Sequence, residues 1–133
     1  MSAANGRETA MQVFTTLLQL VIALIILNVW LLRFGKPTAW RGGAAKSMKE
    51  EFAVYGLPPW SVGVIGFLKV LCAALLIIGV WIPAVVKPAA VGLAVLMLGA
   101  ILMHIKAKDS PQKSVPAVTV LVMCLIVILF RQA

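Results

Sequence analysis

Four long apolar segments divide this chain and leave almost no sequence for a soluble domain. They cover residues 11–32, 60–82, 85–105 and 115–130. A helix of about 20 apolar residues, rising about 1.5 Å per residue, crosses a hydrocarbon core of about 30 Å. Because 62% of the 133 residues are hydrophobic, a soluble fold could not cover them with polar surface. The sequence therefore predicts an all-α integral membrane protein, built as a four-helix bundle.

The same pattern predicts one transmembrane domain at residues 11–133, preceded by an N-terminal arm at residues 1–10. The first apolar segment is longer than the apolar core of a secretory signal, and Arg33 and Lys36 follow it closely. We therefore expect this segment to stay in the membrane as an anchor.

Basic residues are concentrated in two of the connections. Loop 33–59 holds five lysines and arginines and loop 106–114 holds three, whereas the other side has only Arg7, Lys87 and Arg131. Positively charged loops remain in the cytoplasm, so both loops are predicted to be cytoplasmic and both termini to lie outside, with a bacterial inner membrane as the expected location. The net charge of +8 then reflects topology and attraction to anionic lipids, and no nucleic-acid partner is expected.

Loop 33–59 is expected to contain a short helix at residues 48–55, at the membrane interface or across the mouth of the bundle. Ser47 and Glu50 have the spacing of a capping box, in which each side chain accepts a hydrogen bond from the other residue's amide. Gly56 and the prolines that follow end the helix. Three side chains share one face of it: Met48, Phe52 and Tyr55.

Polar residues in the first segment recur with helical spacing, at Gln12, Thr15, Thr16 and Gln19. Because polar groups are costly in hydrocarbon, this stripe should face the bundle rather than lipid. Asn28 lies about half a turn around from Gln19 and belongs to a different contact. Two interpretations stay open, of which we favour the first. The stripe either forms interhelical hydrogen bonds, each contributing less than about 2 kcal/mol, or forms the wall of a ligand or quinone pocket.

Lys69 stands near the middle of the second segment, about nine residues or 13 Å from Trp60. An ammonium at that depth is costly unless it is paired, hydrated or deprotonated. No Asp or Glu lies within the four segments. The lysine either snorkels toward the headgroups or pairs with another group. The candidates for pairing are a backbone carbonyl, an acidic group of another subunit, Gln19, Asn28, Glu50 and Glu51.

Other residue types with chemical potential are few. His104 ends the third segment, and as the chain's one histidine it suits an interface anchor or a hydrogen-bond partner, not a bis-histidine haem. Cys72 and Cys124 lack metal-ligand spacing and are expected to be apolar filler. With no nucleophile–base pair, carboxylate pair or metal cluster, no catalytic residue and no metal site are predicted. The chain by itself is not expected to be an enzyme.

Several runs of residues resemble the DoxX-like family of four-span membrane proteins. They are Glu51–Trp60, Gly66–Leu75, Gly92–Ala100, and His104 to Lys106 with Asp109. The resemblance extends from Arg33 to the end and depends on the order and spacing of these largely apolar runs. It implies the four-helix membrane fold. The wider family is similar to an animal nicotinic-receptor chaperone of the endoplasmic reticulum and to a membrane subunit of thiosulfate:quinone oxidoreductase. Many relatives have a glutamate near the position of Lys69, so their carboxylate chemistry is not carried over.

Three functions stay open, of which we favour an accessory or assembly subunit of a larger membrane complex. A quinone-linked membrane subunit of an oxidoreductase would use the residue 12–19 stripe, Lys69 and His104 as a headgroup pocket, and a small transporter would need a homo-oligomer. No cofactor of its own is expected, only bound lipid or quinone. The expected partners are membrane lipids, with either a larger membrane protein or further copies of the chain. The candidate contacts are Lys69, Gln12, Thr16, Gln19, Asn28, His104, Tyr55 and Glu51.

Overall fold

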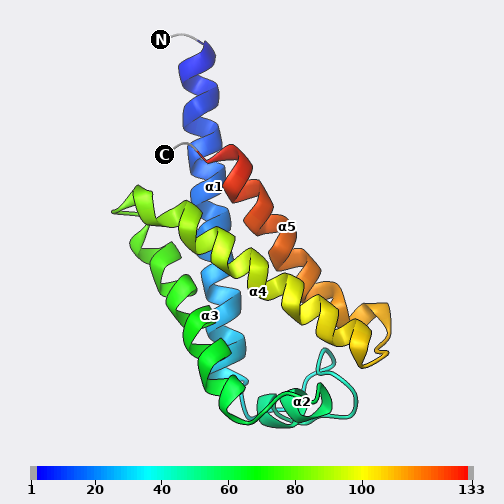
Figure 1. Ribbon diagram of the computed structural model, residues 1–133. Coiled ribbons are helices and arrows are strands. Elements are labelled where there is room, and N and C mark those ends of the chain that lie inside the picture. The colour runs from blue at the N-terminus through cyan, green and yellow to red at the C-terminus, as the bar shows by residue number, and fades with distance from the viewer. Residues whose placement is uncertain (1–2, 132–133) are drawn as a thin grey trace.

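The computed structural model describes residues 3–131 and shows them as an all-helical bundle (Figure 1). Four segments are long and apolar enough to cross a membrane: Gly6–Leu32, Trp60–Ile78, Pro83–Lys106 and Pro111–Phe130. The predicted all-α membrane bundle is confirmed. Its helices are α1 (Ala3–Leu27), the π-helix η1 (Asn28–Leu32), α2 (Met48–Val54), α3 (Trp60–Ile78), the 3₁₀ turn η2 (Pro83–Val85), α4 (Val86–Lys106), the 3₁₀ turn η3 (Pro111–Ser114) and α5 (Val115–Phe130).

The ends of two helices differ from the ranges that hydropathy marks. The described part of the N-terminal arm is helical, because α1 begins at Ala3 and its first turns project beyond the rest of the bundle (Figure 1). The second spanning helix ends at Ile78, with Gly79 as its cap. A Cβ atom on Gly79 would overlap the Val86 side chain, so the glycine permits a tight turn between α3 and α4.

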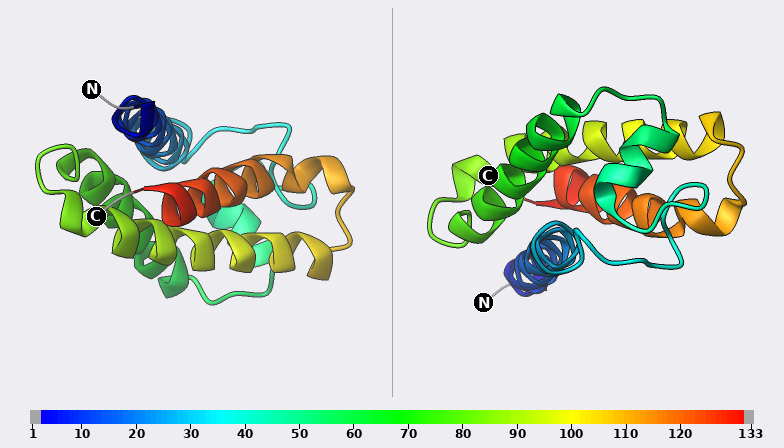
Figure 2. Two further views of the ribbon diagram at one scale, coloured as in Figure 1. Left: turned by 90° about the horizontal axis from the view of Figure 1, so that it is seen from above. Right: turned by 90° about the horizontal axis from the view of Figure 1, so that it is seen from below.

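The four spanning helices form a ring (Figure 2). Helix α1 packs against α3 and α5, and α4 packs against the same two helices. The buried core comes from all four helices and includes Ile22, Leu76, Leu93 and Val127. Many large apolar side chains face outward, as lipid contact requires; Leu24, Phe67 and Leu129 are each more than half exposed.

Loops 33–59 and 107–114 lie together at one end of the bundle, which we call the loop end (Figure 1). The described ends of the chain and the α3–α4 turn lie at the opposite end. This arrangement agrees with the charge pattern, which places the same two loops on one side of the membrane. Which side that is stays a prediction.

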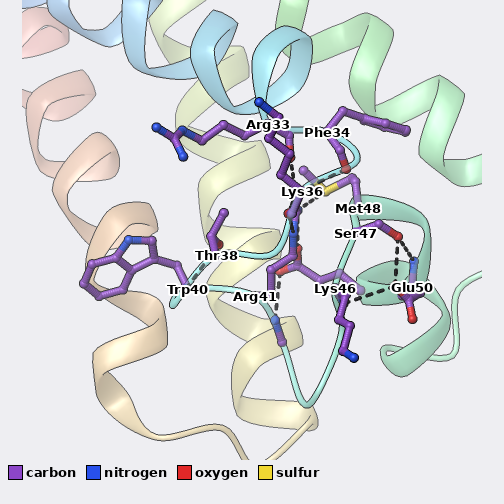
Figure 3. A network of polar contacts seen from close by, with 12 residues as sticks. Arg33, Phe34, Lys36, Thr38, Trp40, Arg41, Lys46, Ser47, Met48 and Glu50 are labelled. Carbon is purple, nitrogen blue, oxygen red and sulfur yellow. Dashed lines mark hydrogen bonds and ion pairs between the residues drawn. The ribbon is translucent and has the colours of Figure 1, made fainter.

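Helix α2 lies across the loop end. The Ser47 hydroxyl accepts a hydrogen bond from the Glu50 amide at 3.2 Å, as the capping box predicts. The return bond differs, because the Glu50 carboxylate accepts from the Lys46 amide and the Ser47 hydroxyl rather than from the Ser47 amide (Figure 3). At the other end Gly56 has φ +75°, and the Leu57 amide donates to the Phe52 carbonyl, which completes a Schellman cap.

Candidate functional site

A cavity of about 600 Å³ lies within the loop-end half of the bundle. All four spanning segments and the first loop contribute to its lining. Most of the lining is apolar and includes Ile25, Val29, Ile65, Leu96, Met97 and Val120. Its volume falls within the range of about 300–1,000 Å³ that is typical of small-molecule sites.

The polar residues of the lining come mainly from the loop end: Asn28, Arg33, Thr38, Arg41, Glu51, Tyr55, Lys69, His104 and Lys113. The fold thus brings together five of the eight residues that the sequence nominates: Asn28, Glu51, Tyr55, Lys69 and His104. The other three, all in the α1 stripe, do not line the cavity. Because the five come from four different elements, only the folded bundle makes them neighbours.

Lys69 is half-buried on α3, and its Nζ atom lies 5.4 Å from the centre of the Trp30 ring. Helical side chains lean toward the N-terminus of their helix, and α3 begins at the loop end, so this lysine extends toward the polar end of the cavity. The contact with Trp30 is a cation–π interaction. Among residues 3–131, no hydrogen bond and no ion pair is made by the Lys69 ammonium.

The Trp30 ring itself is positioned by three features. It belongs to η1, a π-helical turn, and such turns are frequent at functional sites. It packs edge-on against Phe52 of α2, with ring centres 6.0 Å apart. A Cβ atom on Gly66 would lie 2.6 Å from the ring, so only glycine leaves room for it at this point of α3.

Glu51 is the carboxylate at the polar end of the cavity, and it is buried and fully engaged. Its Oε2 atom lies 3.0 Å from Arg41 Nη1. Its Oε1 atom accepts from the Tyr55 hydroxyl at 2.7 Å and from the Gly42 amide at 3.2 Å. Burial, together with the neighbouring Glu51, raises the pKa of Tyr55, so the phenol stays protonated and remains a donor.

Arg41 organises the first part of loop 33–59. Its guanidinium donates to the carbonyls of Arg33, Phe34 and Lys36 (Figure 3). It also donates to the Glu51 carboxylate. The chain therefore wraps around one buried cation, whose charge Glu51 balances.

His104 and Asp109 join the third loop to the first. His104 Nδ1 lies 2.8 Å from Asp109 Oδ2, and Asp109 Oδ1 accepts from the Gly43 amide at 2.9 Å. The Tyr55 hydroxyl lies 3.4 Å from His104 Nδ1, which continues the chain of contacts to Glu51. We call Arg41, Glu51, Tyr55, His104 and Asp109 the latch, because their contacts join the first loop to the end of α4 and to the third loop.

The pKa of Asp109 is held below its ordinary value. Burial alone would raise this pKa, but the hydrogen bonds from His104 and the Gly43 amide, with the charge of Lys113, outweigh that effect. Lys113 also donates to the Gly43 carbonyl at 2.6 Å. The ionised carboxylate is therefore the form that holds the two loops together.

The polar stripe of α1 serves the opposite half of the bundle. Gln19 is fully buried; its Nε2 atom donates to the Leu76 carbonyl at 2.8 Å, and its Oε1 atom accepts from Arg131 at 2.7 Å. Arg131 also donates to the Thr16 hydroxyl at 3.2 Å. Gln12 is half-buried, and its carbonyl accepts from Thr15. The contacts of Gln19 and Thr16 leave α1 and fit the interhelical interpretation of the stripe, whereas the Gln12–Thr15 bond lies within α1.

Arg41 and Asp109 are not among the candidate site residues predicted from the sequence. A signal existed for Asp109, since it is one of four acidic residues and follows the single histidine by five positions. Arg41 gave no signal, because it resembles the other basic residues of its loop. Within the described residues, no group of three or more His, Cys, Asp and Glu side chains is placed to hold a metal ion. Cys72 and Cys124 are both free thiols.

One protein-family model covers both the cavity and the latch. A model of the DoxX-like family matches residues 17–127. The chain belongs to the DoxX-like family. The match spans every residue of the cavity and of the latch, from Ile25 to Val120. No curated protein and no solved structure matches the chain. Membership of the DoxX-like family agrees with the fold of a membrane helix bundle. It does not give the function, because one fold can carry many functions, so the function is argued from the residues of the site.

Proposed function

We propose that this membrane protein binds an amphiphilic molecule inside its bundle, with the head group at the loop end, and that it is a non-catalytic accessory subunit of a larger membrane complex. The cavity is the observation that carries the proposal. An apolar chamber with a few convergent polar groups is the usual form of a small-molecule site. Here the apolar walls come from the spanning helices, and the polar groups surround Lys69 and His104.

Two glycines allow the inside and the outside of the bundle to be tested separately. Gly99 lines the cavity, and Gly63 lies on the outer face of α3; a Cβ atom at either position would meet nothing within 4 Å. Gly99→Leu should therefore fill part of the cavity without an initial clash, and Gly63→Leu is its matched control.

The first experiment purifies the full chain from native membranes in mild detergent and extracts its small molecules for mass spectrometry. We expect one amphiphile to be enriched with the wild type and with Gly63→Leu, and to be depleted with Gly99→Leu. Equal recovery from all three proteins would contradict binding in the cavity.

The accessory role is supported by a groove of about 340 Å³ on the outside of η1 and α3. Its lining includes Trp30, Phe34 and Phe67, with Gly63 and Gly66 between them. Gly63 is exposed on this face of α3, and a small residue at such a position lets another transmembrane helix approach closely. We therefore expect a partner helix to pack here.

Affinity purification from native membranes tests this role. A stoichiometric larger membrane protein should be recovered with the wild type and lost with Gly63→Leu, and Val122→Leu on the exposed face of α5 should keep it. A homo-oligomer without any partner would contradict the accessory role and would favour the oligomeric transporter. The same preparation should place the protein in a bacterial inner membrane.

A quinone-linked membrane subunit of an oxidoreductase is the second candidate. Lys69 and His104 both line the cavity, where they could donate hydrogen bonds to quinone oxygens. This candidate requires a quinone among the extracted molecules and a soluble catalytic partner in the eluate. Recovery of a non-quinone amphiphile would reject it.

A further inference from the structure

We infer that the bound amphiphile is a single-chain acid whose ionised carboxylate pairs with Lys69. The inference rests on the binding proposed above and adds the charge and the size class of the ligand. It follows from an imbalance of charge in the cavity lining.

The lining holds four basic side chains and one carboxylate. Arg41 is bonded to Glu51 and to three backbone carbonyls, and Lys113 donates to the Gly43 carbonyl. The other two cations are Arg33 and Lys69. Neither side chain makes a hydrogen bond or an ion pair with any described residue.

Glu51 acts on Lys69 electrostatically but makes no ion pair with it. Its two oxygens accept from Arg41, Tyr55 and the Gly42 amide, so the carboxylate is already satisfied. No other acidic residue lines the cavity. Lys69 therefore presents its amino group, in contact with the Trp30 ring and without an ion pair, to a chamber that lies within the membrane-spanning part of the chain.

A charge in such a place needs a partner of opposite sign, because removal from water is costly unless the charge is paired. A ligand carboxylate meets this need with one negative charge. A phosphate monoester would bring a second negative charge, for which Lys69 alone offers no partner, since Arg33, the other unpaired cation, is exposed. A neutral head group would leave the ammonium unpaired.

The rest of the cavity suits one hydrocarbon chain. Its apolar walls include Ile25, Ile26, Val29, Leu96 and Val120. The volume of about 600 Å³ lies within the range of about 300–1,000 Å³ that is typical of sites for one small molecule, which favours a ligand with one chain. The acid head would lie beside Lys69, and the tail would extend along these walls.

The test uses the full chain, delipidated in a non-ionic detergent, with tryptophan fluorescence as the readout. Dibromostearic acid quenches nearby tryptophans, and Trp30 borders the cavity. The methyl ester of the same acid is the matched probe without charge. We expect saturable quenching, with the acid bound roughly ten- to hundredfold more tightly than the ester, as for a hydrogen bond to a charged group.

Lys69→Met should abolish this preference for the acid over the ester, whereas Lys69→Arg should retain it. Lys87→Met, a change at the opposite end of the bundle, is the matched control and should behave as the wild type. The wild-type comparison of acid with ester needs no variant, so it stands if Lys69→Met fails to fold.

The outcomes separate the two proposals. Equal affinity of acid and ester in the wild type would overturn the inference and leave the cavity as a binding site. Failure of both probes to quench saturably would contradict binding itself. Competition then tests the head group: palmitate should displace the probe better than hexadecyl phosphate, and the opposite order would reject the carboxylate.

Discussion

Gly43 and Asp109, 66 residues apart in the chain, are joined by a hydrogen bond of 2.9 Å from the Gly43 amide to the Asp109 carboxylate. The same carboxylate accepts from the buried His104, at the end of α4. One acidic side chain thus connects the first loop, the third loop and the wall of the cavity. In its ionised form this carboxylate accepts both hydrogen bonds.

Acid should open this connection. The pKa of Asp109 is lower in the folded protein than its ordinary value, so its contribution to stability is complete above an unfolded pKa of about 3.9 and is lost as the pH falls through the lower, folded value. We expect amide exchange of Gly43, corrected for its intrinsic rate, to increase as the pH is lowered through this range. Asp109→Asn should show fast exchange already at neutral pH. Wild-type protection in that variant would contradict the assignment.

Breaking the buried pair Arg41–Glu51 should be costly. Replacing one partner leaves the other charge buried without its counter-ion, and the expected loss is about 3–5 kcal/mol. Glu51→Leu and Arg41→Met should each destabilise by this amount, measured by unfolding in mixed micelles. The double variant should lose much less than the sum of the two, and simple additivity would show that the pair is not coupled.

Gly42 should not tolerate a side chain. A Cβ atom there would lie 2.6 Å from Tyr55 Cε1. Gly42→Ala must therefore displace the Tyr55 ring, whose hydroxyl donates a hydrogen bond to Glu51. We expect a loss of about 1–3 kcal/mol, as for overpacking. Gly35→Ala, in the same loop, meets nothing within 4 Å and should leave the unfolding midpoint nearly unchanged. Equal behaviour of the two variants would contradict the described packing.

Gln19 should matter for stability and not for ligand binding. Gln19→Leu removes the acceptor of Arg131 and the donor to the Leu76 carbonyl, at an expected cost of about 1–2 kcal/mol. Probe binding in the cavity should be unchanged. Thr119→Val is the control, because Thr119 donates only within its own helix, at an exposed position. A loss of probe affinity in Gln19→Leu would contradict this prediction and favour the interpretation of the α1 stripe as part of the ligand site.

The loop end should face the cytoplasm. Single cysteines at Lys46 and Ser110 should react with an impermeant maleimide only after the cells are opened, and cysteines at Glu8 and Lys87 should react on intact spheroplasts. The reverse labelling pattern would show that the protein has the opposite orientation in the membrane, with the same fold.

The sequence predicts the parts of this structure that depend on local forces. Hydropathy defines the four spans, because no other arrangement satisfies their backbone in lipid. The Ser47 cap and the Gly56 cap are local as well, and both form. The short helix α2 lies within one residue of its predicted range.

The latch could not be predicted, because its bonds join residues that are far apart in the chain. Nothing near Arg41 distinguishes it from the other basic residues of its loop, and its role appears only when Glu51 is placed beside it. The same holds for Lys69, whose contact with Trp30 depends on the π-helical turn and on the space left by Gly66.

Ligand binding in the cavity is tested most directly by an experimental structure of the wild-type protein in lipid nanodiscs, compared with Gly99→Leu. We expect elongated density in the cavity of the wild type, with its head within hydrogen-bonding distance of Lys69 Nζ, and none in the variant. A wild-type cavity that is filled by water, or closed by its own side chains, would contradict the claim that the bundle binds an amphiphile.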